Sequence, residues 1–193
     1  FYIYEWPEDV VLRWPDDYSH PKRLSFGERY RTHHGLGEVV SSRNDLYHTH
    51  QYSLFLTFMK HLRQSPYRTR DPAKASLFFI PYDLAMDSTT RKSDGAFSKT
   101  KCPKMKTAYS LLKNSQYFQR NAGADHFILH TINQVMLYFT DRDCLQIYKI
   151  CYHCVKLSID VYSKSEFREL QEVGEFMNNR WYSIPFPSNV HLQ

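Results

Sequence analysis

The chain has 193 residues, 16% of them aromatic, and carries 25 basic against 20 acidic side chains, a formal net charge of +5. The aromatic content, with only six glycines and nine prolines, excludes collagen, coiled coils and intrinsic disorder, and the modest, scattered positive charge argues against nucleic-acid binding. No apolar run reaches about 18 residues, so we expect no membrane-spanning helix within this sequence.

The first third of the chain predicts a strand, an irregular segment and a helix. Residues 1–4 are apolar and rich in aromatic side chains, which is typical of a strand. Residues 13–43 are rich in Pro, Gly, Arg, His and Ser and show little periodicity, so we expect an irregular segment. Apolar residues then recur at helical spacing, which predicts a helix of about five turns over 44–65.

The rest of the chain alternates strands with helical segments. Apolar runs predict strands at 77–80, 127–129, 155–161 and 181–184. Helical patterns predict a short turn at 71–75, a helix over 103–118 and another from Ser163. The segment 132–139 fits either a helix or a strand, and 87–101 has the composition of a polar loop.

This alternation predicts an α/β fold with a mostly parallel sheet and right-handed crossovers. In such sheets, ligands bind beyond the carboxyl ends of the strands. The residues just past those ends are Glu5 and Trp6, Tyr82 and Asp83, His130 and Thr131, and 186–188.

The four cysteines are Cys102, Cys144, Cys151 and Cys154. They allow three disulfide pairings, and the sequence does not choose among these. The spacing of the last two matches a zinc knuckle, but a structural zinc site needs a second ligand pair of similar spacing. Two disulfides, formed in an oxidising compartment, and buried thiols are the alternatives. A bond between Cys151 and Cys154 is disfavoured because its loop is so short.

Three short motifs are weak indications of a ligand site. The Gly-x-Gly at 35–37 lacks the third glycine and the preceding strand of a dinucleotide fingerprint. Asp141 and Asp143 form a D-x-D pattern that fits a metal-diphosphate site or a solvated turn. His48 and His50 fit metal ligands or exposed polar side chains. We therefore predict no metal site.

Arg120, Asp125 and His126 surround a glycine turn that leads into a predicted strand. In a structural interpretation, Asp125 binds turn amides and His126 binds a neighbouring carbonyl or carboxylate. In a functional one, Asp125 orients His126 so that it can bind a sugar hydroxyl or take a proton.

Four blocks of the sequence, taken together, resemble the exostosin family, glycosyltransferase family 47. They match the family's blocks in order and span the whole chain: Phe1 to Pro7, Ser65 to Pro81, Tyr117 to Phe127, and Ile184 to Ser188. The sequence departs from the pattern at Phe118, where the family usually has Trp, and at Ala124, where it usually has Arg.

The resemblance implies an inverting glycosyltransferase of the GT-B type, with two Rossmann-like domains. Residues 1–193 would then be a single acceptor-side, amino-terminal domain, with the donor-binding domain and a type II membrane anchor outside this chain. The family implies a Golgi location, a nucleotide sugar as donor substrate, polysaccharide synthesis, and no cofactor or metal. The expected partner is a glycan acceptor and not nucleic acid, and a dimer is compatible with this reading.

The resemblance and the strand ends together suggest site residues. Asp83, His130 and His126 are the candidate catalytic residues, of which the first two follow strands and could deprotonate an acceptor hydroxyl. The candidate substrate-binding residues are Arg120, Asp125, Glu5 and Trp6. The alternative is a non-catalytic exostosin-like module that binds glycan or stabilises a partner.

Overall fold

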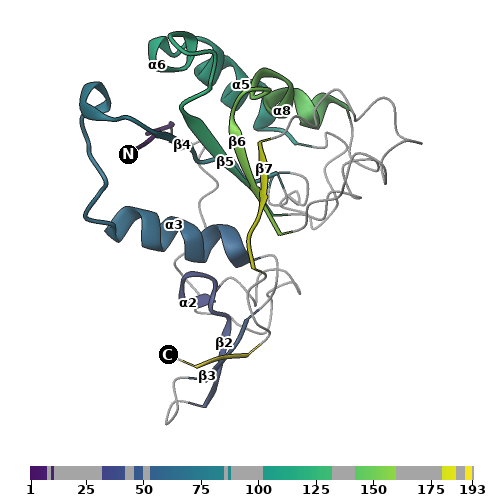
Figure 1. Cartoon of the computed structure of the whole chain (residues 1–193). Helices are drawn as coiled ribbons and strands as arrows, with labels where there is room; N and C mark the ends of the chain where they lie inside the picture. The colour runs from purple at the N-terminus through teal and green to yellow at the C-terminus, as the bar shows by residue number, and fades with distance from the viewer. Residues whose placement is uncertain are drawn as a thin grey trace. The chain divides into compact units, whose positions relative to one another are not determined.

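The structure is a computed structural model of the chain, and its elements fall into two compact units (Figure 1). The first unit comprises residues 1–12 and 67–184, and the second comprises residues 13–66 and 185–193. The structure describes residues 1–7, 10, 32–41, 46–49, 53–84, 87, 102–131, 142–159, 180–185 and 190–192. Each unit is described below by itself.

The first unit is built on a five-stranded sheet in which every neighbouring pair of strands is parallel. Its strands, in sheet order, are β1 (Tyr2–Ile3), β4 (Phe78–Ile80), β5 (His126–His130), β6 (Val155–Ser158) and β7 (Trp181–Ser183). The α/β fold with a mostly parallel sheet is therefore confirmed, and each of these strands lies within or beside an apolar run that predicted it.

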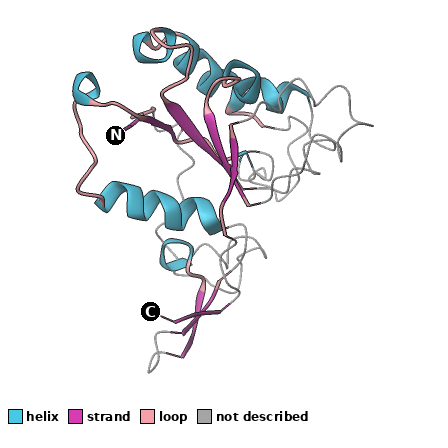
Figure 2. Ribbon diagram, in the orientation of Figure 1, coloured by secondary structure: helices cyan, strands magenta, loops and turns pink. Residues whose placement is uncertain are grey.

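The strand order follows the chain without a reversal. Right-handed crossovers between strands that always advance in one direction place the connecting helices on one face of the sheet. The helices α5 (Met105–Lys113), α6 (Gln116–Gln119) and α8 (Gln146–Ile150) accordingly lie on the same side of the strands (Figures 1 and 2).

A buried core fills the space between this face and the helices. Ile80, Ile128 and Trp181 contribute from three strands, and Leu112 and Ile147 contribute from α5 and α8. Leu112 and Ile147 are completely buried, and burial of such a side chain is worth about 1.5–3 kcal/mol. A disulfide between Cys102 and Cys144, which precede α5 and α8, joins the two helical connections.

The second unit contains a three-stranded antiparallel sheet with the order β2-β3-β8 and two helices. The strands are β2 (Glu38–Ser41), β3 (Leu46–His48) and β8 (Val190–Leu192), and the helices are α2 (Thr32–Gly35) and α3 (Leu54–Gln64). Gly35 has a φ of +93° and packs tightly on α3, because a Cβ there would lie 2.9 Å from Cβ of Leu56.

Several boundaries differ from those that the sequence predicted. The helix predicted over 44–65 begins only at Leu54, because the β-prone run Leu46–His48 pairs with β2 instead. The segment predicted as irregular contains α2 and β2 in its described part. The helix predicted over 103–118 is interrupted at Ser115, whose extended backbone separates α5 from α6.

The turn predicted at 71–75 is confirmed as the 3₁₀ helix η3 (Pro72–Lys74), capped by the Asp71 carboxylate. The sequence analysis missed α8, the preceding 3₁₀ helix η4 (Arg142–Leu145) and β8. The segments 88–101, 132–139 and 163–179, and residues 186–188, lie outside the described residues.

Candidate functional site

The candidate residues of the first unit lie at opposite ends of the parallel strands of its sheet. We call the side where the strands begin the amino edge and the side where they end the carboxyl edge. His126 begins β5 and His130 ends it, so the two histidines are about 13 Å apart along one strand. Arg120 and Asp125 lie next to His126 at the amino edge. Asp83 follows β4 and therefore lies at the carboxyl edge with His130. The structure thus does not bring the seven candidate residues into one site.

At the carboxyl edge, a hydrogen bond joins the ends of β4 and β5. The hydroxyl of Thr131 donates to Oδ1 of Asp83 at 2.6 Å, and both side chains are buried. This bond orients the Asp83 carboxylate where the carboxyl ends of parallel strands meet. The strand order shows no reversal among the described strands, so this edge is identified by its polar side chains and not by a topological switch point.

His130 is completely buried at the same edge. Its Nδ1 lies 2.9 Å from the hydroxyl of Tyr148, and its ring meets the rings of Tyr148 and Trp181 edge to face. Among the described residues, no hydrogen-bond partner contacts its Nε2. Burial lowers the pKa of His130 to about 3, so the imidazole is neutral at pH 7. A neutral imidazole with one open nitrogen is suited to hydrogen bonding and poorly suited to accepting a proton.

Glu5 and Trp6 follow β1 and face different surroundings. Glu5 is exposed, with one oxygen 3.8 Å from a guanidinium nitrogen of Arg68. Trp6 is buried in the core, and its indole Nε1 has no hydrogen-bond partner among the described residues. Trp6 therefore acts as a core side chain, and its predicted role in substrate binding stays a prediction.

At the amino edge, a chain of hydrogen bonds runs from Asp125 to Ser115. Oδ1 of Asp125 lies 2.7 Å from Nδ1 of His126, and Nε2 of His126 lies 2.8 Å from the hydroxyl of Tyr4. That hydroxyl also lies 3.0 Å from Oγ of Ser115. Both nitrogens of the buried His126 ring are therefore engaged.

The pKa shifts assign the protons along this chain. Asp125 is ionised, because hydrogen bonds from Asn121, Arg120 and His126 lower its pKa in spite of partial burial. Burial lowers the pKa of His126 and raises that of Tyr4, so the imidazole is neutral and the phenol keeps its proton. Nδ1–H of His126 then donates to Asp125, and the Tyr4 hydroxyl donates to Nε2.

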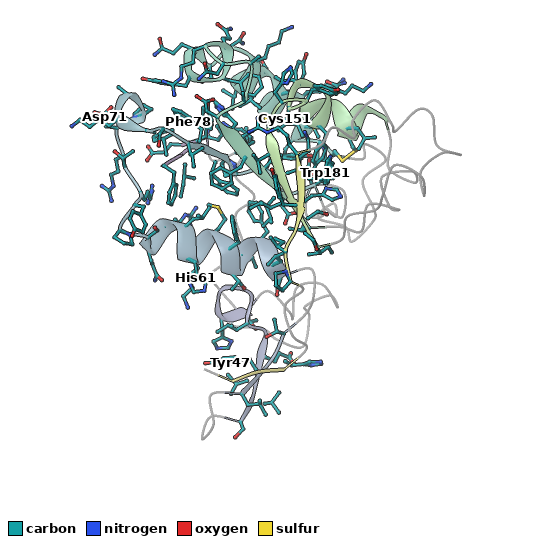
Figure 3. All side chains as sticks on the ribbon, in the orientation of Figure 1. Tyr47, His61, Asp71, Phe78, Cys151 and Trp181 are labelled. Atoms are coloured by element: carbon teal, nitrogen blue, oxygen red, sulfur yellow. A yellow bond between two sulfur atoms is a disulfide. The ribbon has the colours of Figure 1, made fainter. Side chains whose placement is uncertain are left out.

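Arg120 adds a further hydrogen bond to the amino-edge network, at its Asp125 end. Its guanidinium donates to Oδ2 of Asp125 at 3.0 Å and lies 4.9 Å from the centre of the Phe78 ring, which stacks on His126. Figure 3 shows Phe78 among the strands of this unit. His126 bonds a neighbouring carboxylate, as the structural interpretation predicts, whereas the contacts of Asp125 are with the side chains of Asn121, Arg120 and His126 and not with turn amides. The predicted catalytic and binding roles stay predictions.

The metal-binding interpretations of Asp141 and Asp143, and of His48 and His50, gain no support from the described residues. No group of three or more His, Cys, Asp or Glu side chains in these ranges could hold a metal ion. Asp141 and His50 lie outside the described residues, as does the side chain of Asp143. In the same ranges, no helix is both long enough and apolar enough to cross a bilayer.

The sequence analysis missed Tyr148 as a residue of the carboxyl edge. Tyr148 lies on the unpredicted helix α8, binds His130, and has its pKa raised by burial and by the charge of Asp83. It therefore binds the end of β5 and lies within the electrostatic influence of Asp83. The five-residue helix is too short to produce a clear helical period, which is the signal that could have identified it.

Comparison with known proteins adds one finding. A family model described as the Exostosin GT47 domain matches residues 1–193. No curated protein and no solved structure matches the chain significantly.

Proposed function

The chain belongs to the exostosin GT47 family, and on this premise we propose that it is the acceptor-binding part of an inverting glycosyltransferase. The complete enzyme transfers a sugar from a nucleotide sugar to a growing glycan or polysaccharide. In this proposal, the contacts to the nucleotide come from a donor-binding domain outside the chain, and the protein requires no metal or other cofactor. A Golgi lumenal location, with a type II membrane anchor, belongs to the same proposal.

The observation that carries the proposal is the hydrogen bond between Asp83 and Thr131. It holds a carboxylate in one orientation at the edge of the sheet where α/β proteins bind ligands. Inverting transfer requires a base that removes the proton of the acceptor hydroxyl as its oxygen attacks the anomeric carbon. We assign this role to Asp83, with Thr131 as its positioning residue.

His130 supports Asp83 as a binding group. Its pKa of about 3 makes it a weak proton acceptor at neutral pH, but its open Nε2 can form a hydrogen bond with a sugar hydroxyl. Tyr148 fixes the plane of the imidazole through the bond to Nδ1. In this proposal, His130 therefore binds the acceptor and does not serve as the catalytic base.

The burial of this edge favours a second candidate function. Asp83 and His130 have 0% of their surface exposed, so a substrate reaches them only if neighbouring segments move. A non-catalytic module that binds glycan or stabilises a partner needs no accessible base. The substitutions at Phe118 and Ala124, relative to the family pattern, are compatible with such a module.

An assay on the longest natural protein that contains this chain distinguishes the two functions. Release of nucleoside diphosphate is measured with a panel of nucleotide sugars and oligosaccharide acceptors. Asp83→Asn keeps the shape of the side chain and removes the base, so we expect kcat to fall by about 10²- to 10⁴-fold with little change in KM. Asp71→Asn is the matched control, because Asn caps the turn at 72–74 as well as Asp does.

Each outcome decides between the two. A normal kcat in Asp83→Asn removes the assigned base. Saturable oligosaccharide binding by the wild-type protein, with no transfer from any donor, supports the non-catalytic module.

A further inference from the structure

Two cysteines outside the disulfide share one tight turn at the amino edge of the sheet. Cys151 and Cys154 lie between α8 and β6, and Figure 3 labels Cys151. The backbone N–H of Cys154 donates to the carbonyl of Cys151 at 3.0 Å. Burial and the neighbouring Cys154 thiol raise the pKa of Cys151. A turn closed in this way keeps its first and fourth Cα atoms within about 7 Å, which nearly coincides with the span of a disulfide.

A buried lysine holds the turn in place. Nζ of Lys156 donates to the carbonyls of Tyr152 and Cys154 at 2.9 and 3.1 Å, and the Lys156 side chain is fully buried. Its ammonium interacts electrostatically with both thiols. A nearby positive charge stabilises a thiolate, which is the form of cysteine that attacks a disulfide.

The neighbouring residues pack tightly but leave one side of the turn open to solvent. A Cβ at Gly123 would lie 3.0 Å from Sγ of Cys154, so the glycine turn forms one wall. Tyr152 and His153, between the two cysteines, are exposed.

The short loop disfavours this bond on sequence grounds, but the closed turn already holds the two residues within its span. We propose that Cys151 and Cys154 form a reversible dithiol–disulfide pair, separate from the structural Cys102–Cys144 bond. The oxidant is a small-molecule disulfide. A thiolate of the pair attacks one of its sulfurs and releases the first thiol, which gives a mixed disulfide. The second cysteine then attacks the protein sulfur of that bond, releases the second thiol and closes the ring. The dithiol loses two electrons, and the small disulfide gains them.

The Cys102–Cys144 bond supports this inference, because structural disulfides persist mainly where the surroundings are oxidising. In the same surroundings, two adjoining thiols meet the same oxidants. Burial raises the pKa of Cys151, so the exchange is slow and is limited by opening of the turn. The pair is independent of the proposed sugar transfer, because it lies at the edge opposite to Asp83.

The test measures the redox equilibrium of the native chain in mixtures of reduced and oxidised glutathione. Samples that start reduced and samples that start oxidised are incubated until they agree, then quenched in acid, unfolded and treated with a maleimide. Peptide mass spectrometry counts the labelled cysteines. We expect the labels on Cys151 and Cys154 to disappear together in one reversible transition, while Cys102 and Cys144 stay unlabelled.

Cys154→Ser is the matched control, because it keeps the turn but cannot close the ring. Its one remaining thiol of the pair, Cys151, is expected either to keep its maleimide label or to carry a glutathione adduct, and never to lose the label without that adduct. The proposal is overturned if both wild-type cysteines remain labelled at every glutathione ratio. It is also overturned if the wild-type chain stops at the mixed disulfide.

Discussion

The hydroxyl of Tyr4 lies 2.8 Å from Nε2 of His126, and this bond joins two strand segments that are not neighbours in the sheet. Strand β4 separates them, and its Phe78 ring stacks on the imidazole with ring centres 4.8 Å apart. The bond therefore passes over β4 on the helix-covered face. It engages the nitrogen of His126 that a catalytic role would need, which is why the geometry favours a structural function.

Tyr4→Phe tests how much this hydrogen bond contributes to the stability of the fold. The substitution removes the donor to His126 and leaves Nε2 buried without a partner, so we expect the free energy of unfolding to fall by about 1–3 kcal/mol. Tyr117→Phe is the control, because its ring stacks on Phe78 but no hydrogen bond of its hydroxyl is seen in the described part of the chain. Urea unfolding of the two variants gives the comparison, and equal stabilities would contradict the structural role.

The parts of the fold that the sequence predicted share one property. Runs such as 77–80 and 127–129 are apolar, and most of their side chains, among them Phe78, Ile80 and Ile128, are completely buried, so the apolar run itself marks the strand. The helix predicted over 44–65 was too long because its first residues are β-prone and pair with β2, which lies earlier in the chain. Local periodicity does not report such pairing.

The candidate site was predictable only in part for the same reason. The strand ends identified Asp83, His130 and Thr131, because a carboxyl end can be located once its strand is known. The sequence could not show that His126 is held by Tyr4, which lies 122 residues away. It also could not show that His130 meets Tyr148, since that contact depends on the packing of a helix without a clear pattern of its own.

Burial of His130 makes the stability of the fold sensitive to acid. In the unfolded chain a histidine takes up a proton near pH 6.5, whereas His130 in the fold does so only near pH 3. Between these values the unfolded state binds more protons, so stability falls as the pH falls. The contribution of His130 approaches about 1.4 kcal/mol per pH unit inside this window.

The measurement is guanidinium unfolding of the wild-type chain and of His130→Gln at several pH values from 7.5 to about 4. Gln keeps a polar group for Tyr148 but does not titrate, so we expect the variant to lose less stability per pH unit. His126 contributes in the same direction in both proteins, because its pKa is also lowered. Parallel pH profiles would show that His130 does not titrate as its burial implies.

The turn before β5 predicts opposite effects for two adjacent substitutions. Gly123 has a φ of +80°, and a Cβ there would lie 2.7 Å from Cε2 of Phe118, so Gly123→Ala should cost about 1–3 kcal/mol. Ala122 has a φ of +49°, a region that L-residues avoid, so Ala122→Gly should gain up to about 1 kcal/mol.

Ala124→Gly is the control for this pair. Ala124 is exposed in the same turn but is not among the residues with positive φ, so the substitution should only add flexibility to the unfolded chain and cost up to about 1 kcal/mol. Thermal unfolding ranks the three variants. A loss of stability in Ala122→Gly as large as that in Ala124→Gly would contradict the turn geometry.

The disulfide between Cys102 and Cys144 should stabilise the first unit by restricting the unfolded chain. It closes a loop with a sequence separation of 42 residues. For a loop of this length, the lost chain entropy corresponds to about 4 kcal/mol of stability.

The double variant Cys102→Ala, Cys144→Ala should therefore unfold at a lower guanidinium concentration than the wild-type chain. A reductant should lower the wild-type midpoint by more than that of the variant, in which only Cys151 and Cys154 are left to be reduced. If the reductant shifts both proteins equally, the stabilisation comes from another pair of sulfurs and not from this bond.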